Sequence, residues 1–518
     1  MVEFIIGNVT TKVVTGEWRI QKLIYDALHY EETGYGKRGR WKRSESYYNP
    51  NEGFFLTGFL LRVLKHLRTQ NVQYRLTDSR KRPEIKERII ELHGIELREY
   101  QTKAVLDFFK EGRGIAHLAT GAGKTEIAIA ATWYADAPTL FLTHRVELLR
   151  QTRNRFKKRL PRKKIGMIGD GVFAPEQITL ATVQTVDSIL TRYNKLMQGR
   201  KTYTDEKLDR VIELLHEKKN AKKITGKEGD KLAELEGLLL LFKSEDEIRQ
   251  KYAAIKQLLG SIRLLIIDEA HRSGNRQFYQ AANMCSNAYW RLALTATPFM
   301  HESVKDNLML EGITGRIVSR VSIKTLIELG VLAQPYFRFY PVRDPKGMRS
   351  TTGWPNIYER GIIQNAARNA LIVKSAKQLV KMGRKTLIIV AKKVHGRLLA
   401  ESLQLEGVKA EYVDGDVNSD QREKALKSIA SGKLECIVCT NIFDEGIDVE
   451  SIGGVILAAG NKSAPALFQR AGRAMRKKEE NNYCIVIDFI DNQHPKLLEH
   501  SMRRYKLVEQ EEGFKILR

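Results

Sequence analysis

Residues that could bind a chain of phosphates lie near position 120. A predicted strand at residues 115–118 and a predicted helix at 126–134 flank the sequence Thr120-Gly121-Ala122-Gly123-Lys124-Thr125. Glycines 121 and 123 let backbone N–H groups approach phosphate oxygens, and a helix N-terminus attracts anions. Lys124 can reach the terminal phosphates, and the Thr125 hydroxyl can bind Mg²⁺. The stretch predicts a P-loop that binds ATP, with an ordinary strand-to-helix turn as the alternative.

Two adjacent carboxylates follow a second apolar stretch. Residues 263–267 predict a buried strand, and Asp268 and Glu269 come directly after it. Asp268 can hold Mg²⁺, while Glu269 can orient and deprotonate an attacking water molecule. A buried strand that ends in two carboxylates has no evident structural purpose, so the pair favours a hydrolytic site.

Polar side chains also follow other predicted strands in this part of the chain. Strands at 139–142, 179–182 and 294–297 end at or near Thr143, His144, Arg145, Gln184, Thr295 and Thr297. Ligands of open parallel sheets bind at the carboxyl ends of the strands. The alternation of strands and helices from about residue 97 to 320 therefore predicts a parallel α/β domain with a site at that edge.

A second α/β unit is predicted to begin near residue 330. Its strands are expected at 336–340, 386–391, 410–413, 436–440, 455–458 and 483–488. On a helix near its end, Gln469, Arg473 and Arg476 share one face, because their spacing is i, i+4 and i+7. Guanidinium groups on one face can stabilise the charge of a triphosphate in its transition state. A surface basic stripe is the alternative for this face taken alone.

The composition is that of a soluble globular protein of about three domains. The 518 residues are 42% hydrophobic and 29% charged, and no apolar run reaches the roughly 18 residues of a membrane span. The first residues do not form a signal peptide, so we expect a cytoplasmic protein, in the host cytoplasm if it is phage-encoded. Cys436 and Cys439 form a C-x-x-C within a predicted strand, where residues three apart face opposite sides. We interpret them as core residues in preference to a metal or redox site.

The net charge points to a polyanionic partner. Lys and Arg number 87 against 61 Asp and Glu, which gives +26. Such an excess favours nucleic acid and makes binding dependent on salt. Basic stretches at 38–43, 153–160 and 473–478 are spread along the chain, which favours a nucleic-acid track over a basic tail.

Three domains are predicted, at residues 1–90, 91–325 and 326–518. The first is a small α+β domain whose Gly- and aromatic-rich stretch at 30–43 could bind phosphates and stack on bases, with a solvated loop as the alternative. A polar linker is expected at 77–91. Residues 190–260 predict an inserted pair of helices around a break at 225–229, which we interpret as a solvated hairpin in preference to a partner-binding arm.

The motifs, taken in order, resemble those of DEAH-type superfamily 2 helicases. They are LREYQ (97–101), ATGAGKT (119–125), LTHRVELLRQT (142–152), LATVQT (180–185), IDEAH (267–271), LTATP (294–298), CTNIFDEGIDV (439–449) and QRAGRAMR (469–476). The resemblance implies two tandem RecA-like P-loop domains. The order of strand, helix, TGYGKRGRWK and GFLLRVLKHLRTQNVQYRL in the first 90 residues is similar to UvsW-like phage recombination helicases.

The resemblance also implies roles for individual residues. Gln101 would read adenine, and Thr295 and Thr297 would couple hydrolysis to movement. Gly446 and Asp448 would contact the nucleotide, together with Gln469, Arg473 and Arg476. The residues implied for the nucleic-acid track are Thr143, His144, Arg145, Gln184, Thr440 and Asn441.

The implied activity is ATP-dependent unwinding or branch migration of recombination and replication-fork DNA. The expected partner is single-stranded, forked or branched DNA, and the expected cofactors are ATP and Mg²⁺. A duplex-DNA translocase subunit that does not separate strands, and a helicase acting on RNA or RNA–DNA hybrids, are the alternatives. An ATPase that has lost activity is disfavoured, since Lys124, Asp268, Glu269 and Arg476 are present. We expect a monomer with no membrane association.

Overall fold

The computed structural model describes residues 1–36, 39–85, 89–221, 224–270, 276–299, 303–342, 348–413, 419–440, 452–460 and 482–517. The chain forms two units, one of residues 1–117 and 125–319 and one of residues 118–124 and 320–518. The short segment 118–124 is grouped with the second unit, and in it the Ala119 N–H donates to the Val321 carbonyl at 3.1 Å.

The first unit is built on a sheet whose strand order is β10-β9-β11-β8-β12-β13-β7-β14. Six neighbouring strands, from β9 through β7, pair in parallel. The strands of the sheet are β7 Arg113–Leu118, β8 Thr139–Thr143, β9 Ile165–Gly169, β10 Val172–Ala174, β11 Ile178–Thr182, β12 Leu264–Asp268, β13 Trp290–Thr295 and β14 Ile317–Val321. Every residue of β8, β11, β12 and β13 is buried, as in a parallel sheet covered on both faces. The predicted parallel α/β arrangement is confirmed.

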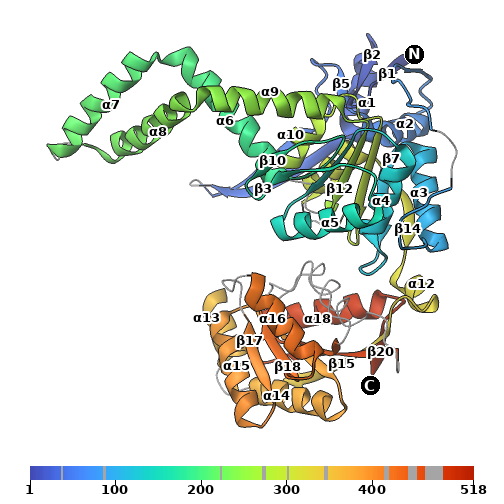
Figure 1. Cartoon of the computed structure of the whole chain (residues 1–518), viewed down its shortest axis with the longest axis vertical. Helices are drawn as coiled ribbons and strands as arrows, with labels where there is room; N and C mark the ends of the chain where they lie inside the picture. The colour runs from blue at the N-terminus through green and yellow to red at the C-terminus, as the bar shows by residue number, and fades with distance from the viewer. Residues whose placement is uncertain are drawn as a thin grey trace. The chain divides into compact units, whose positions relative to one another are not determined.

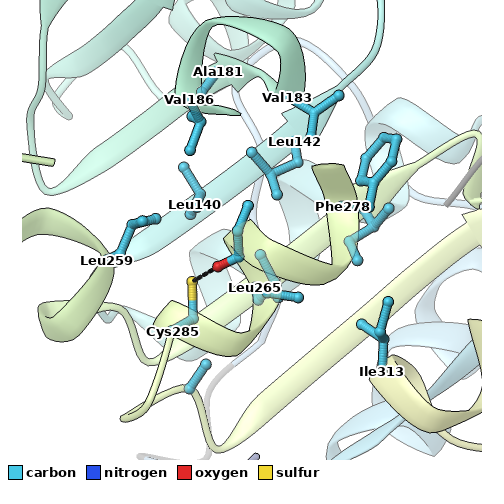
Figure 2. Close-up of a cluster of buried hydrophobic side chains, with 14 of the residues drawn as sticks. Leu140, Leu142, Ala181, Val183, Val186, Leu259, Leu265, Phe278, Cys285 and Ile313 are labelled. Atoms are coloured by element: carbon cyan, nitrogen blue, oxygen red, sulfur yellow. Dashed lines mark hydrogen bonds between the residues drawn. The ribbon is translucent and has the colours of Figure 1, made fainter. Parts of the chain in front are cut away.

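Helices cover this sheet and fill its core. Figure 2 shows Leu140, Leu142 and Leu265 of the strands in one cluster with Val186, Leu259 and Phe278 of the helices, all of them buried. Each such side chain contributes about 1.5–3 kcal/mol through removal from water. The helices of this unit that precede and follow the strands are α3 Glu99–Glu111, α4 Lys124–Ala135, α5 Val146–Arg159, α10 Arg276–Met284 and α11 Val304–Thr314.

The N-terminal residues form a separate small sheet with its own core. Its strand order is β5-β2-β1-β6, and a two-stranded ribbon of β3 and β4 extends from it (Figure 1). The elements are β1 Val2–Ile6, β2 Thr10–Val14, α1 Trp18–Ala27, β3 His29–Gly36, β4 Gly39–Ser46, β5 Phe54–Leu56, η1 Thr57–Phe59, α2 Leu60–Thr69 and β6 Tyr74–Asp78. The alternative of a loop at 30–43 is wrong, because β3 and β4 pair over eight residues each. Residues 77 and 78 of the expected linker belong to strand β6.

The insertion between β11 and β12 consists of four helices in the described residues. They are α6 Val183–Thr202, α7 Asp205–Asn220, α8 Gly226–Lys243 and α9 Glu245–Ser261. In Figure 1, α7 and α8 lie side by side as an arm away from the sheet, and Leu208, Ile212 and Leu235 belong to the arm's own apolar core. The predicted break lies slightly too late in the chain, since Gly226 and Gly229 are inside α8. Thr225 caps that helix by accepting from the Glu228 N–H, and the Glu228 carboxylate bonds back.

The second unit is a parallel sheet in the order β17-β18-β16-β19-β20-β15-β21. Its strands are β15 Gln334–Val342, β16 Lys385–Ile389, β17 Ala410–Val413, β18 Cys436–Cys439, β19 Ile452–Leu457, β20 Tyr483–Asp491 and β21 Lys515–Leu517. The helical segments that the structure describes here are α12 Ile323–Glu328, α13 Trp354–Tyr358, η3 Glu359–Ile363, α14 Ala366–Lys381, α15 Lys393–Leu405, α16 Ser419–Ala430 and α18 Pro495–Gln510. All six predicted strands are confirmed, and β21 was not predicted.

The cysteines are core residues, as interpreted from the sequence. Cys436 and Cys439 are buried and unbridged within β18, and burial raises the pKa of the Cys436 thiol. Among the described helices, none combines the length and apolar character that a membrane span requires.

Candidate functional site

The strands of the first sheet bring the predicted polar residues to one edge. Because β8 and β11 are parallel and Thr143 pairs with Thr182, both strands end at the same level. Asp268 pairs with Leu294, and Thr295 pairs with His117, so β12, β13 and β7 also end there. β13 lies between β7 and β12, which places the ends of these two strands about 10 Å apart.

The loop between β7 and α4 has the backbone that a phosphate-binding loop requires. Gly121 and Gly123 adopt φ values of +90° and +79°, which side chains rarely tolerate. The Ala122 N–H donates to the Ala119 carbonyl at 3.1 Å and closes a tight turn. Helix α4 begins at Lys124, so Lys124 and Thr125 occupy its first turn, where backbone N–H groups attract anions. Thr120 lies in the same loop and is half-buried.

Asp268 and Glu269 adopt a strained arrangement at the end of β12. Asp268 is only 8% exposed, and its Oδ1 accepts the backbone N–H of Glu269 at 3.0 Å. Glu269 has φ of +48°, in the left-handed region that a residue with a Cβ enters at a cost of about 1–3 kcal/mol. Strain of this kind is typical of functional sites. Sequence reasoning identified the residue but could not detect the strain.

The hydroxyls after β13 are buried and fixed by the backbone. The Thr297 N–H donates to Oγ1 of Thr295 at 3.1 Å. Thr297 is 4% exposed, and its own hydroxyl has no hydrogen-bond partner among the described residues. His117, which the sequence did not single out, donates from Nε2 to the Ala296 carbonyl at 3.0 Å. This bond joins the strand before the P-loop to the Thr295–Thr297 segment.

Gln101 lies in the first turn of α3 and is buried. Its Oε1 accepts the backbone N–H of Arg98 at 3.0 Å and fixes the helix start. Burial raises the pKa of the neighbouring Tyr100. A glutamine amide carries both donors and an acceptor, as recognition of a purine would require.

The residues predicted to line a nucleic-acid track are brought together in part. Gln184, in the first turn of α6, donates from its amide to the His144 backbone carbonyl at 2.8 Å. Arg145 is the N-cap residue of α5, and Thr143 is the last residue of β8. The four residues therefore gather at the ends of β8 and β11. The Thr143 hydroxyl is buried, with no hydrogen-bond partner in the described part of the chain.

The basic stretch at 153–160 is not part of that group. It forms the last turns of α5, a helix of 14 residues whose N-cap is Arg145. The helix is about 21 Å long, so the stretch lies at the opposite end from the predicted track. The charges of this stretch therefore do not support the track directly.

Several residues expected in the second unit lie outside the described residues. They are Asn441, Gly446, Asp448, Gln469, Arg473 and Arg476. Thr440 is described: it follows β18 directly and is half-buried. The roles implied for all seven stay predictions.

Buried ion pairs fix the carboxyl end of β20 in the second unit. Arg368 of α14 contacts Asp491 at 2.8 Å, and Arg504 of α18 contacts Asp488 at 2.8 Å, with all four side chains nearly inaccessible to solvent. Arg368 also donates to the Ala458 carbonyl at 2.9 Å, beside the end of β19. Sequence analysis did not detect these pairs, because nothing along the chain connects their members.

The residues present suit a magnesium ion held together with a phosphate ligand. No group of three or more His, Cys, Asp or Glu side chains arranged for a metal occurs in the described residues. A hydroxyl from Thr125 and a carboxylate from Asp268 are oxygen donors of the kind that Mg²⁺ prefers, and Mg²⁺ commonly completes its shell with phosphate and water. Such an ion would neutralise phosphate charge.

Comparison with known proteins identifies the class. Residues 94–300 match the family model described as "Type III restriction enzyme, res subunit", and residues 369–478 match the "Helicase conserved C-terminal domain". The chain belongs to the superfamily 2 helicases, a class of ATP-hydrolysing enzymes with two α/β domains.

Two individual relatives share about a quarter of their aligned residues with this chain. The DNA 3'-5' translocase XPB2 of Sulfurisphaera tokodaii is 24% identical over 80% of this chain and 85% of its own length. The ATP-dependent DNA helicase UvsW of phage T4 is 24% identical over 46% of this chain and 47% of its own. The chain spans about half the length of two viral relatives that it matches. A fragment assigned as the HsdR subunit of a type I restriction enzyme of Vibrio vulnificus YJ016 shares the fold, with a TM-score of 0.53, 15% identity and coverage of 94% of this chain and 77% of that one.

Proposed function

We propose that this protein is an ATP-driven DNA helicase or translocase that unwinds or branch-migrates forked and recombination intermediates. The observation that supports this most directly is the convergence at one sheet edge of the P-loop strand, the Asp268–Glu269 pair and the Thr143–Gln184 group. A site for nucleotide hydrolysis and a site for nucleic acid then share the ends of the same strands. With this arrangement, hydrolysis would alter the affinity for a bound nucleic-acid strand.

In this proposal the residues of the first sheet divide the work of hydrolysis. The P-loop glycines and Lys124 hold the phosphates, Thr125 and Asp268 hold Mg²⁺, and Glu269 accepts a proton from the attacking water. Gln101 would select adenine, and Thr295 and Thr297 would relay the change. From the second unit, Gly446, Asp448, Gln469, Arg473 and Arg476 would complete the nucleotide site, on the basis of the sequence motifs alone.

The track for DNA would begin at Thr143, His144, Arg145 and Gln184, with Thr440 and Asn441 from the second unit. Binding there would be dominated by phosphate contacts and would be largely blind to sequence. This agrees with the net charge of +26.

The β3–β4 ribbon would give the N-terminal domain its role as an accessory DNA-binding element. Trp41 is 43% exposed, and its cross-strand partner is Gly34, so the indole has no side chain opposite it. Its neighbours Lys42 and Arg43 are also exposed. An exposed aromatic ring among cations can stack on bases while the cations contact phosphates.

The base of the ribbon is attached firmly to the first α/β domain. Glu32 of β3 contacts Lys305 of α11 at 2.7 Å, and the Tyr47 hydroxyl donates to the Lys305 carbonyl at 3.1 Å. Arg62 forms a bidentate pair with Glu311 on the same helix. Because α11 follows the Thr295–Thr297 segment, a movement of that segment would be transmitted to the ribbon.

A duplex-DNA translocase that does not separate strands is the second candidate. The family model that matches residues 94–300 is named after a restriction-enzyme subunit, and the HsdR fragment of a type I restriction enzyme shares the fold. An RNA or RNA–DNA hybrid substrate is a further alternative that the sequence left open.

The proposal is tested by ATPase stimulation at fixed salt with single-stranded, duplex, forked and four-way DNA, and with RNA. We expect the largest stimulation with forked or four-way DNA, accompanied by strand separation. Stimulation by duplex DNA without strand separation would favour the second candidate, and stimulation by RNA alone would contradict a DNA enzyme.

A further inference from the structure

The end of α5 and the connection to β9 form a dense cluster of positive charge. Residues 153–164 contain eight Lys and Arg and no Asp or Glu. We use the name α5 basic surface for its members other than Arg159, whose guanidinium bonds to backbone carbonyls. They are Arg153, which is half-buried, and the exposed Arg155, Lys157, Lys158, Arg162, Lys163 and Lys164.

This surface lies at the amino edge of the first sheet, away from the candidate site. Lys164 directly precedes Ile165, the first residue of β9, and Ile165 pairs with Ile178 at the start of β11. Ile178 in turn pairs with Thr139 at the start of β8. The Thr143–Gln184 group is at the other ends of these strands, so the length of α5, about 21 Å, separates it from the end of the surface at Arg162 to Lys164.

Part of the charge has a structural use. Arg159 donates to the carbonyls of His93 and Gly94, and it lies 3.4 Å from the Glu126 carboxylate. Lys163 pairs with Asp136 at 2.6 Å. Lys157 and Lys158 in the last turn also complement the helix dipole.

Four exposed cations of the surface are not explained by ion pairs. Lys157, Lys158, Arg162 and Lys164 are exposed and form no ion pair within the described residues. Arg162 and Lys164 lie beyond α5, where the helix dipole does not reach. Keeping several like charges close together costs free energy, and a polyanion would remove that cost.

The shape of the surface suits a phosphate backbone. A hollow of about 460 Å³ is lined by Arg153, Lys157, Pro161, Lys163, Lys164, Ile165 and Glu176. Glu176 is the one acidic side chain in this lining, so the four basic side chains outnumber it.

The side chains between the cations identify the kind of polyanion. Phe156, Leu160 and Ile165 are buried, so the surface offers neither an aromatic ring for stacking nor the apolar centre of a protein interface. Single strands are commonly bound by stacking on aromatic rings, whereas a duplex presents phosphates with its bases enclosed.

We propose that the α5 basic surface binds the phosphate backbone of duplex DNA that continues beyond the site formed by Thr143, His144, Arg145 and Gln184. This inference rests on the proposed function and adds a second, separate contact to it. At 3.4 Å per base pair, a duplex that leaves the site along α5 reaches the end of the surface at Arg162 to Lys164 after about 6 base pairs. Shorter duplex arms would not contact this end of the surface.

The test measures DNA affinity as a function of salt for the full chain. The DNA probes are forks with hairpin-capped duplex arms of about 4 and about 16 base pairs, chosen to end before and after that length. The variants are K157Q/K158Q/R162Q/K164Q and, to leave the helix untouched, R162Q/K164Q. The matched control is K219Q/K227Q/K231Q/K243Q, which removes four exposed lysines of the α7–α8 arm.

On the fork with the long duplex we expect the slope of log K against log salt to become less steep. The change should be about 3–4 for the fourfold variant and about 2 for the twofold variant. On the short arm, and for the ATPase stimulated by single-stranded DNA, we expect no change. An unchanged slope on the fork with the long duplex would overturn the inference. So would an equal change of slope on both forks, or an equal change in the control variant of the α7–α8 helices. If DNA stimulated no ATPase in the wild-type protein, the proposed function would fail, whatever the slopes.

Discussion

The backbone N–H of Glu269 donates to the carboxylate of Asp268 at 3.0 Å, and Glu269 itself adopts a left-handed conformation with φ of +48°. The two adjacent carboxylates are therefore held differently. Asp268 is buried and fixed at the end of β12, whereas Glu269 turns away from the strand direction. Two like residues in sequence can then serve two purposes, one as a ligand and one as a base.

Replacing Glu269 with glutamine should separate nucleotide binding from hydrolysis. Glutamine has the same shape but cannot accept the proton of the attacking water, so we expect ATP turnover to fall by about 10²- to 10⁴-fold. Nucleotide affinity should change little. Turnover and equilibrium binding, measured with Glu213→Gln as an exposed acidic control, check this expectation. Turnover equal to that of the wild type would remove Glu269 from the role of base.

Replacing Glu269 with glycine should stabilise the fold and abolish activity. Glycine adopts φ of +48° without the strain of a Cβ, so we expect the free energy of unfolding to rise by about 1 kcal/mol. Urea unfolding of the two variants at position 269 measures the difference. A glycine variant less stable than the glutamine variant would show that the backbone strain is not a cost here.

Replacing Lys124 with alanine should abolish ATP hydrolysis with the fold intact. Lys124 opens α4 at the point where phosphates are expected, and its charge is needed where negative charge develops. The control is Lys110→Ala, on an exposed position of α3. Circular dichroism and turnover are the measurements, and wild-type turnover in the Lys124 variant would refute the site.

The sequence predicted the parts of the fold that are buried on both sides. The strands at 139–143 and 264–268 are continuous apolar runs, and a parallel sheet covered by helices requires such runs. The ribbon β3–β4 was left open between a binding element and a loop. Residues 41–44 of β4 are exposed and glycines stand at 34, 36 and 39, so the ribbon does not show the apolar alternation of a half-buried strand.

The candidate site was predicted residue by residue but not in its geometry. His117 contacts Ala296, and Gln184 contacts His144, across 179 and 40 residues of sequence. Such contacts depend on the strand order, in which β13 lies between β12 and β7, and a motif does not determine that order. The basic stretch at 153–160 was assigned to the track, because its charge is visible in sequence whereas the direction of α5 is not.

The N-terminal domain should detach from α11 when Gly58 is enlarged. A Cβ at Gly58 would lie 2.1 Å from the Glu311 carbonyl oxygen and 2.4 Å from that of Gly312, so the two backbones would have to separate. We expect Gly58→Ala to cost about 1–3 kcal/mol. Hydrogen exchange in α11 and η1, with Gly16→Ala as the control because nothing lies within 4 Å of its Cβ, measures this loss. Unchanged protection of α11 would show that the contact does not hold the domain.

His395 should make the second unit less stable as the pH falls below about 6.5. It is fully buried on α15, where its Nε2 donates to Oδ1 of Asn369 at 2.9 Å. Burial, with the positive charge of Arg368 as a smaller cause, lowers the pKa of His395 to about 3. In the unfolded chain its pKa is about 6.5. Between these values the unfolded state binds a proton that the folded state does not, so the free energy of unfolding falls with decreasing pH.

The histidine therefore contributes a limiting slope of about 1.4 kcal/mol per pH unit between pH 6.5 and 3. In the His395→Gln variant the amide can donate to Asn369 but does not titrate. Its unfolding in this pH range should therefore take up about one proton fewer than that of the wild type, so its free energy of unfolding should depend less on pH. Urea unfolding at several pH values between about 4 and 7, with the exposed His93→Gln as the control, compares the slopes. Parallel slopes for the wild type and the His395 variant would show that His395 takes up its proton in the folded state, which the burial of its ring among Arg368 and Asn369 argues against.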